Sequence, residues 1–170
     1  WLEQNEDCVD YRFWKAYWWG THRDYQFIRR LDAEDRLGDF IPSGLSVDRG
    51  YQLGSEHQVT NTLNKYPVLK KDTFLRYGPL TQDNFGPSPG LIKARIGNLD
   101  LYDGPRLVFS RSPKQAARAH GRLIARFEKA KFCFTDDVLG IQLKDGTDYA
   151  YLILLGILWS SFSRYYLWFA

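Results

Sequence analysis

Seven basic side chains lie between Arg111 and Lys131, with Glu128 as the single acidic residue among them. The rest of the chain carries 16 basic and 19 acidic residues, so this segment holds a local charge of +6 on an otherwise slightly acidic protein. A concentrated basic segment is typical of proteins that bind a polyanion. A solvated surface without a partner is the alternative, because such runs are common on protein surfaces.

Part of this basic segment has helical spacing. Five cations recur at intervals of four, four, four and three residues, which a continuous helix would align in one stripe: Lys114, Arg118, Arg122, Arg126 and Lys129. Gly121 interrupts the run and costs a helix about 1 kcal/mol relative to Ala. We therefore expect a short helix or loop from Pro113 to His120 and then a strand, with the basic side chains projecting from one compact region.

The chain lacks the motifs with which several classes of enzyme hold substrates and cofactors. It contains no phosphate-binding loop, no His-Glu-x-x-His helix, no nucleophile elbow and no acid followed by Glu-x-Lys, the pattern of a metal-dependent nuclease. His22, His57 and His120 are scattered, and Cys8 and Cys133 have neither metal-ligand spacing nor a disulfide framework. We expect no catalysis, no metal and no cofactor in this chain. We also expect Cys133 to be a buried strand residue in a reducing compartment.

The elements that position these side chains begin with an aromatic run from Tyr11 to Trp19, which predicts a strand. Thr21 and Asp24 form a capping box followed by apolar residues at helical spacing, which predicts a helix that ends before Gly38. Aromatic side chains usually fill cores, and we expect this of three tryptophans: Trp18, Trp19 and Trp159.

Residues 41–104 are rich in turns, and from there to the end the pattern becomes more regular. Alternating and β-branched runs predict strands at Pro67–Leu69, Leu91–Ala94, Arg106–Arg111, Arg122–Glu128, Lys131–Thr135 and Val138–Leu143. A final helix is expected at Tyr149–Phe169, and its apolar run of about eleven residues is too short for a membrane span. The predicted fold is α+β: a mixed, mainly antiparallel β-sheet region with short helices and a C-terminal core helix.

The composition suits a globular protein with one sizeable core. The chain has 170 residues, of which 44% are hydrophobic and 16% aromatic. It contains no methionine, and its first ten residues are acidic rather than a signal peptide. We therefore expect a fragment of a longer cytoplasmic protein.

Three stretches, spread from end to end of the chain, carry a family resemblance. They are an aromatic run with Gly-Thr and a helix at Phe13–Leu31, the Gly-Pro-Arg-Leu-Val-Phe-Ser-Arg strand at Gly104–Arg111, and the apolar helix at Tyr151–Tyr166. Together they resemble the specificity half of bacterial adenine-specific DNA methyltransferases, including fused restriction–methylation enzymes with TaqI-like C-terminal specificity domains. The third stretch is similar to the family's Leu-x-Gly/Ala-Ile-Leu-Asn-Ser helix, with Trp159 where Asn is usual.

The resemblance implies a division of labour. Residues 39–170 would be a target recognition domain that grips double-stranded DNA, and residues 1–38 a junction strand and helix leading to a methyltransferase domain of the same parent protein. The Asn/Asp-Pro-Pro-Tyr/Phe motif that holds a flipped adenine is missing from this chain. Methylation, with S-adenosylmethionine as cofactor, would therefore belong to the preceding domain of a cytoplasmic restriction–modification enzyme.

Candidate DNA contacts follow from side-chain chemistry, since Lys and Arg bind phosphate or guanine and Asn and Gln match adenine. The phosphate or guanine candidates are Arg111, Lys114, Arg118 and Arg122. The candidates for base edges in the turn-rich middle are Arg49, Gln52, His57, Gln58, Asn61 and Asn64. The alternative is a protein–protein interaction module of a restriction–modification or defence complex, whose aromatic ends and basic segment would contact other proteins.

Overall fold

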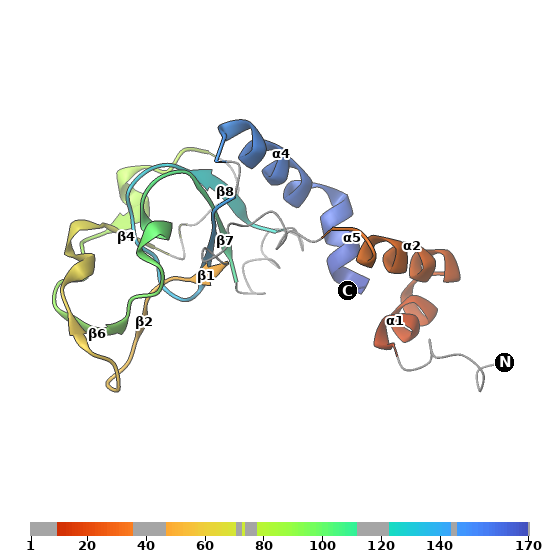
Figure 1. The fold of residues 1–170 in the computed structure, drawn as a ribbon, viewed down its shortest axis with the longest axis horizontal. Helices are drawn as coiled ribbons and strands as arrows, with labels where there is room; N and C mark the ends of the chain where they lie inside the picture. Colours follow the sequence, from red (N-terminus) through yellow and green to blue (C-terminus); the bar gives the residue numbers. More distant parts are fainter. Residues whose placement is uncertain are drawn as a thin grey trace.

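The computed structural model describes residues 10–35, 47–70, 73, 78–111, 123–143 and 146–169. The chain forms a β-rich lobe and a helical lobe. Helix α4 (Asp148–Trp159) connects the two lobes (Figure 1). The fold is α+β, as expected, with antiparallel sheets in one lobe and short helices in the other. Across the described ranges, no helix is both long and apolar enough to cross a bilayer.

A four-stranded antiparallel sheet forms the middle of the β-rich lobe. Its order is β1 (Asp48–Arg49), β9 (Val138–Ile141), β7 (Arg106–Ser110) and β8 (Ala125–Glu128). Leu107 and Ile141 belong to the core on the α4 side, whereas Val108 belongs to the core on the other side. Burial on both faces explains why β7 reads as a nearly continuous apolar run. The strands expected around residues 106–111, 122–128 and 138–143 are confirmed, with shorter bounds.

Two smaller antiparallel sheets complete this lobe. One has the order β2 (Gln52–Leu53), β6 (Ile92–Arg95), β3 (Val59–Thr60), and the other pairs β4 (Val68–Leu69) with β5 (Phe85–Gly86). The connections include the 3₁₀ helices η4 (Thr62–Lys65), η6 (Gln82–Asn84) and η7 (Leu99–Tyr102). The strands expected near residues 67–69 and 91–94 are confirmed as β4 and β6.

The strand expected at Lys131–Thr135 is wrong, because these residues make only isolated bridges, between Val68 and Cys133 and between Tyr51 and Thr135. The Cys133 amide donates to the Pro67 carbonyl at 2.9 Å, and the Cys133 carbonyl accepts from Leu69 at 2.8 Å. The segment passes through the core and divides its backbone hydrogen bonds among several neighbours, so no regular ladder forms. Cys133 is buried as expected, and burial raises the pKa of its thiol to about 12.

Residues 11–19 form helix α1 (Tyr11–Trp19) and not the expected strand. Asp10 caps the helix by accepting a hydrogen bond from the Arg12 amide at 2.9 Å, and Gly20 closes it by donating to the Ala16 carbonyl at 2.9 Å. Phe13 and Ala16, one turn apart, pack in the same small core. Capping and this packing outweigh the preference of aromatic residues for strands.

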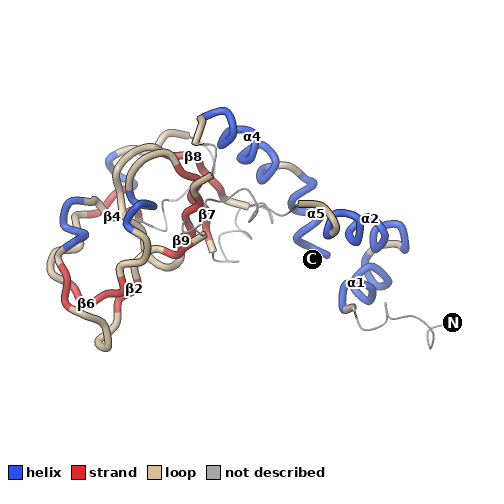
Figure 2. The backbone as a smooth tube through the Cα atoms, in the orientation of Figure 1, coloured by secondary structure: helices blue, strands red, loops and turns tan. Residues whose placement is uncertain are grey.

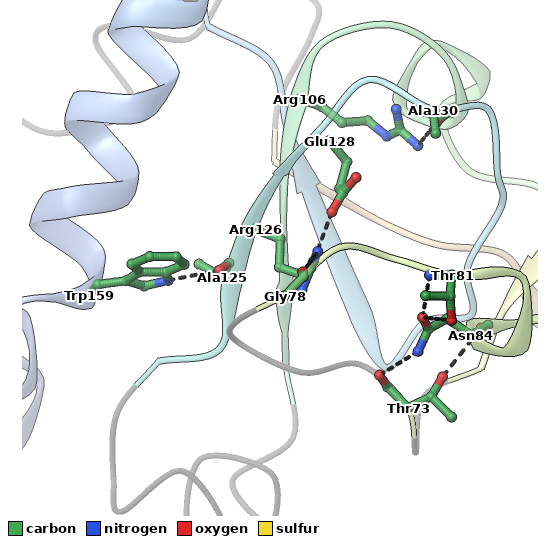
Figure 3. Close-up of polar contacts among 10 residues, drawn as sticks. All are labelled: Thr73, Gly78, Thr81, Asn84, Arg106, Ala125, Arg126, Glu128, Ala130 and Trp159. Atoms are coloured by element: carbon green, nitrogen blue, oxygen red, sulfur yellow. Dashed lines mark hydrogen bonds and ion pairs between the residues drawn. The ribbon is translucent and has the colours of Figure 1, made fainter.

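The environments of the three tryptophans differ. Trp18 and Trp19 are 75% and 72% exposed, so the expectation that they fill a core is wrong. Both follow the last buried residue of α1, Ala16, and the helix ends before a further turn could bring them back to the core. Trp159 does pack in a core, and its indole N–H donates to the Ala125 carbonyl of β8 at 2.8 Å (Figure 3).

The capping box predicted from Thr21 and Asp24 is confirmed at the start of helix α2 (His22–Asp32). The Thr21 amide donates to the Asp24 carboxylate at 2.6 Å, and the Thr21 hydroxyl accepts from the Asp24 amide at 3.4 Å. Tyr25 and Ile28 are buried at the predicted helical spacing. The helix ends well before Gly38, as expected.

The single helix expected at Tyr149–Phe169 is two helices, α4 and α5 (Ser161–Phe169), separated at Ser160. Ser160 has an extended backbone, and its hydroxyl donates to the Ile157 carbonyl at 2.6 Å. The Ser163 hydroxyl donates to the same carbonyl at 2.7 Å. Serine side chains compete with backbone groups for such bonds, which explains the break.

After the break, α5 turns back toward the beginning of the chain and packs against α1 and α2 (Figure 2). Tyr165 and Tyr166 cover a small core formed by Ala16, Tyr25 and Ile28. The hydroxyl of Tyr165 donates to the Asp24 carboxylate, and that of Tyr166 donates to the Asp32 carboxylate at 2.6 Å. The helical lobe is therefore built from both ends of the sequence.

The bond between Tyr165 and Asp24 predicts a pH-dependent stability. The Tyr165 hydroxyl, and then Thr21, holds the pKa of Asp24 below its ordinary value of 3.8. A lowered folded-state pKa contributes stability that is present above about pH 4 and is lost as the pH falls through that lowered value. We expect Tyr165→Phe to reduce the free energy of unfolding by about 1 kcal/mol at pH 7. Urea denaturation should show that the difference in free energy of unfolding between the variant and the unaltered protein becomes smaller toward pH 2.

Tyr149→Phe is the matched control. Tyr149 is 74% exposed at the start of α4 and has no hydrogen-bond partner among the described residues. The Tyr149→Phe variant should therefore have the same free energy of unfolding as the unaltered protein at every pH. If Tyr165→Phe lowers the free energy of unfolding by the same amount at pH 2 and pH 7, the charge of Asp24 has no role in this stability.

Candidate nucleic-acid interface

The outer face of the β2–β6–β3 sheet presents a compact set of exposed side chains. Ile92 and Ala94 of β6 point toward the core, so Lys93 and Arg95 between them point outward. The strand register places Gln52 opposite Arg95 and Val59 opposite Lys93. We call these four exposed residues, Gln52, Val59, Lys93 and Arg95, the ribbon face.

The two cations of the ribbon face, Lys93 and Arg95, make no ion pair with the part of the chain that the structure describes. Asp48, an acid in the wall of the neighbouring groove, has a carboxylate oxygen that accepts a hydrogen bond from the Arg49 amide at 2.7 Å. With respect to the described residues, both cations can therefore bind an external anion or hydrogen-bond acceptor without breaking an ion pair.

Three other surface cations of the lobe, Lys70, Lys129 and Lys131, make contacts within the protein. Lys131 lies 2.7 Å from Asp103, and this contact raises the pKa of Lys131 and lowers that of Asp103. Lys129 pairs with Asp148 at the start of α4, and the Lys70 ammonium donates to the Asp83 carbonyl at 3.1 Å. The ribbon face thus differs from these sites, because no residue in the described ranges forms an ion pair with its cations.

A groove of about 790 Å³ lies beside Arg95. Its walls combine polar and apolar groups in similar amounts and are formed by Asp48, His57, Gln58, Val59, Thr60, Thr62, Ala94, Arg95, Ile96 and Gly97. The Nε2 atom of His57 lies 3.3 Å from the Glu56 carboxylate at the edge of this groove. Amide, hydroxyl, imidazole and guanidinium groups together can hydrogen-bond a polar, planar ligand such as a base edge.

Close backbone contacts hold the ribbon face in place. The Ala94 amide donates to the Gln58 carbonyl and the Gly54 amide to the Lys93 carbonyl, both at 3.2 Å. Gly97, with a φ of +74°, follows β6 and approaches the Arg49 carbonyl too closely for a side chain. The buried Tyr102 hydroxyl donates to the Ile96 carbonyl at 2.6 Å, and burial raises the pKa of Tyr102. These contacts hold the backbone at Arg95 and Gln52 in place, so the two side chains start from fixed positions.

The structure brings together only some of the residues predicted to contact DNA. Gln52 belongs to the ribbon face, and Gln58 and His57 line the adjacent groove. Arg49 is exposed on the edge strand β1, opposite Leu139 of β9. Asn61 and Asn64 are exposed on either side of the start of η4 and do not line the groove.

The basic segment is only partly described. Arg111 is exposed directly after β7, where its amide donates to the Asp137 carbonyl at 2.8 Å. Lys114, Arg118 and Arg122, together with the expected helix or loop at residues 113–120, lie outside the described residues.

The expectation that all the basic side chains of this segment project outward is wrong for Arg126. This residue is 7% exposed, and its guanidinium donates to Glu128 at 2.8 Å and to the Gly78 carbonyl at 2.7 Å (Figure 3). Arg126 lies in β8 on the face opposite α4, where the strand turns it toward the protein. The four-residue spacing between Arg122 and Arg126 therefore does not place Arg126 in a row of basic side chains on the surface.

Lys93 and Arg95 were missed by the sequence analysis. The signal that could have found them is the Ile-Lys-Ala-Arg alternation at residues 92–95, because alternation puts both cations on one face of a strand. Their pairing with Gln52 and Val59 depends on residues more than 30 positions away and needs the structure. As for metals, no cluster of three or more potential ligands occurs among the residues that the structure describes.

Comparison with known proteins gives no relative from which to transfer a role. No protein-family model, curated protein or solved structure matches the chain.

Proposed function

We propose that this chain binds double-stranded DNA and is the non-catalytic sequence-recognition domain of a bacterial adenine-specific DNA methyltransferase. The observation that carries the proposal is the ribbon face, where two cations with no ion-pair partner among the described residues lie beside the amide of Gln52 on a hydrogen-bonded sheet. Cations supply phosphate contacts, and guanidinium and amide groups match base edges. The resemblance of three sequence stretches to specificity domains independently suggests the same partner.

Within this proposal, the catalytic domain and its S-adenosylmethionine belong to the rest of the parent protein, which acts in the cytoplasm. The helical lobe suits a contact with such a domain because α1 exposes a set of large aromatic side chains: Tyr11, Trp14, Tyr17, Trp18 and Trp19. An exposed apolar patch of this kind is typical of an interaction site.

Charge reversal on the ribbon face tests DNA binding. We expect the affinity of the full chain for a labelled duplex, measured by fluorescence anisotropy, to fall steeply between about 50 mM and about 200 mM salt. The double variant Lys93→Glu/Arg95→Glu should bind the duplex at least about 10-fold more weakly at low salt. The salt slope, which is the slope of log binding constant against log salt concentration, should become less negative by about 2, because two phosphate or base contacts are lost.

Arg23→Glu with Arg30→Glu is the control for net charge. These exposed arginines lie at opposite ends of α2, so the same change in charge has opposing effects on the helix dipole. The control should bind DNA almost as well as the unaltered chain. Absence of duplex binding at low salt, or an equal loss in the control, would overturn a specific role of the ribbon face.

The exposed aromatic side chains of α1 also favour a second candidate, a protein–protein interaction module whose partner is another protein. Tyr17, Trp18 and Trp19 are each more than 70% exposed. The two candidates differ in one competition experiment: a DNA-binding domain releases labelled duplex only to unlabelled duplex, whereas an interaction module with a basic surface prefers an acidic peptide.

A further inference from the structure

We infer that Arg95 and Gln52 form a base-reading pair, in which Arg95 contacts a guanine and Gln52 contacts an adenine in a neighbouring base pair of the major groove. This inference rests on the proposed function and goes further, because it assigns a recognition role to two opposed residues and places the bases that they contact in neighbouring base pairs. Lys93 and Val59 extend the same face by one more cross-strand pair.

The register of the sheet sets the spacing of these contacts. Gln52 and Arg95 are directly opposed, and opposed residues of antiparallel strands have Cβ atoms about 5 Å apart. Base pairs are stacked about 3.4 Å apart, so long side chains from such a pair reach adjacent steps. Lys93 and Arg95 are two residues apart on β6, a distance of about 6.7 Å, which corresponds to about two base-pair steps. The ribbon face therefore matches a site of about three or four base pairs.

The side chains differ in what they can recognise. The guanidinium of Arg95 offers two parallel donors, which match the O6 and N7 acceptors of guanine. The amide of Gln52 offers a donor and an acceptor, which match N7 and the amino group of adenine. The ammonium of Lys93 donates to a guanine or a phosphate, while the exposed Val59 methyls can contact the methyl group of thymine.

The shape of this element selects the major groove. β6 pairs with β2 at Ala94 and Arg95 and with β3 at Ile92 and Lys93, so the face is two strands wide at each position. Neighbouring strands lie about 4.8 Å apart, so a two-stranded face with its side chains fits a groove about 12 Å wide but not one about 6 Å wide. The major groove also displays a different pattern for each base pair, whereas the minor groove mainly separates A·T from G·C. Arg95 and Gln52 can therefore discriminate bases in the groove that the ribbon can enter.

Arg95 is prepared for this role in two ways. It is exposed and has no ion-pair partner among the described residues, so no internal contact must break before it binds a base. Its strand is bonded on both sides, to β2 and to β3, which fixes the direction of its side chain. Both features lower the cost of ordering the side chain on binding.

Selection from a random duplex library, followed by affinity measurements on the selected duplex, tests the inference. The full unaltered chain should select a site with adjacent adenine and guanine. Arg95→Ala should lower affinity for that site roughly 5- to 150-fold and abolish the guanine preference, and Gln52→Ala should do the same for the adenine. Arg95→Lys should retain part of the guanine preference, because Lys donates to guanine without the paired geometry.

Arg23→Ala is the matched control, since Arg23 is an exposed arginine of α2, outside the ribbon face. It should leave both the affinity and the selected site almost unchanged. If Arg95→Ala keeps the guanine preference, or if the unaltered chain selects no site while binding duplex, the base-reading pair is wrong and the proposed DNA binding stands. If the unaltered chain binds no duplex at all, both fail.

Discussion

Replacing Gly50 with alanine is expected to destabilise the β-rich lobe by at least about 3 kcal/mol. A Cβ atom at this position would lie only 1.9 Å from the Phe134 carbonyl oxygen and 2.5 Å from that of Thr135. Both obstacles are backbone atoms of a segment whose neighbours Phe132 and Cys133 are fully buried, so neither can move cheaply. The change therefore separates β1 and β2 from the core instead of shifting one flexible side chain.

Urea and thermal denaturation measure this effect, with Gly156→Ala as the control. Gly156 lies within α4, and a Cβ atom there would have no heavy atom within 4 Å apart from its chain neighbours and the helix's own backbone. Alanine in the interior of a helix is favoured over glycine, so the control should raise the free energy of unfolding by up to about 1 kcal/mol. An unchanged midpoint for Gly50→Ala would show that residues 133–135 are more adaptable than their burial indicates.

Gly50 also links stability to the candidate site. It lies between Arg49 and Gln52, and its amide donates to the Val138 carbonyl at 3.1 Å. The amide of Tyr51 then donates to the Phe134 carbonyl at 2.9 Å. These contacts determine where β2 leaves the core and consequently where Gln52 meets Arg95. Partial loss of DNA selectivity should accompany the loss of stability.

Local signals predicted the elements whose structure is decided locally. The capping box of α2 needs only Thr21 and Asp24, and it was found from their spacing. The strands β7, β8 and β9 show apolar patterns that burial on two faces explains. The α+β fold could be predicted for the same reason, because a few neighbouring residues indicate whether each of these elements is a helix or a strand.

Elements that depend on distant contacts were the ones misjudged. The aromatic run of α1 has the composition of a strand, but its helix is completed by Asp10 and by packing against α2 and α5. The break at Ser160 depends on two serine hydroxyls that share one carbonyl. The ribbon face could not be assembled from the sequence, since Gln52 and Arg95 meet only when a register between separate turn-rich segments is known.

The second large effect is expected for Arg126→Met, which should reduce the free energy of unfolding by about 3 kcal/mol or more. Methionine preserves most of the side-chain length but removes the donors to Glu128 and to the Gly78 carbonyl. The Glu128 side chain is only 14% exposed, so its charge would be left largely buried without its nearest partner. Breaking a buried ion pair on one side leaves the desolvation cost of the remaining charge.

A double-mutant cycle with Glu128→Gln measures the coupling. Each single variant should be destabilised, because it leaves one polar group of the pair without its partner. The double variant should recover much of the stability, since it contains neither buried charge. Strictly additive losses, with no recovery in the double variant, would contradict a direct coupling between Arg126 and Glu128.

The same variants separate structural from DNA-binding cations in the basic segment. If Arg126 supports the sheet and does not contact DNA, the folded Arg126→Met/Glu128→Gln protein should retain the duplex affinity and salt slope of the unaltered chain. Its net charge is unchanged, because one positive and one negative side chain are lost together. A flattened salt slope in this neutral double variant would show that Arg126 contacts phosphate after all, and the assignment of binding to cations without internal partners would then be wrong.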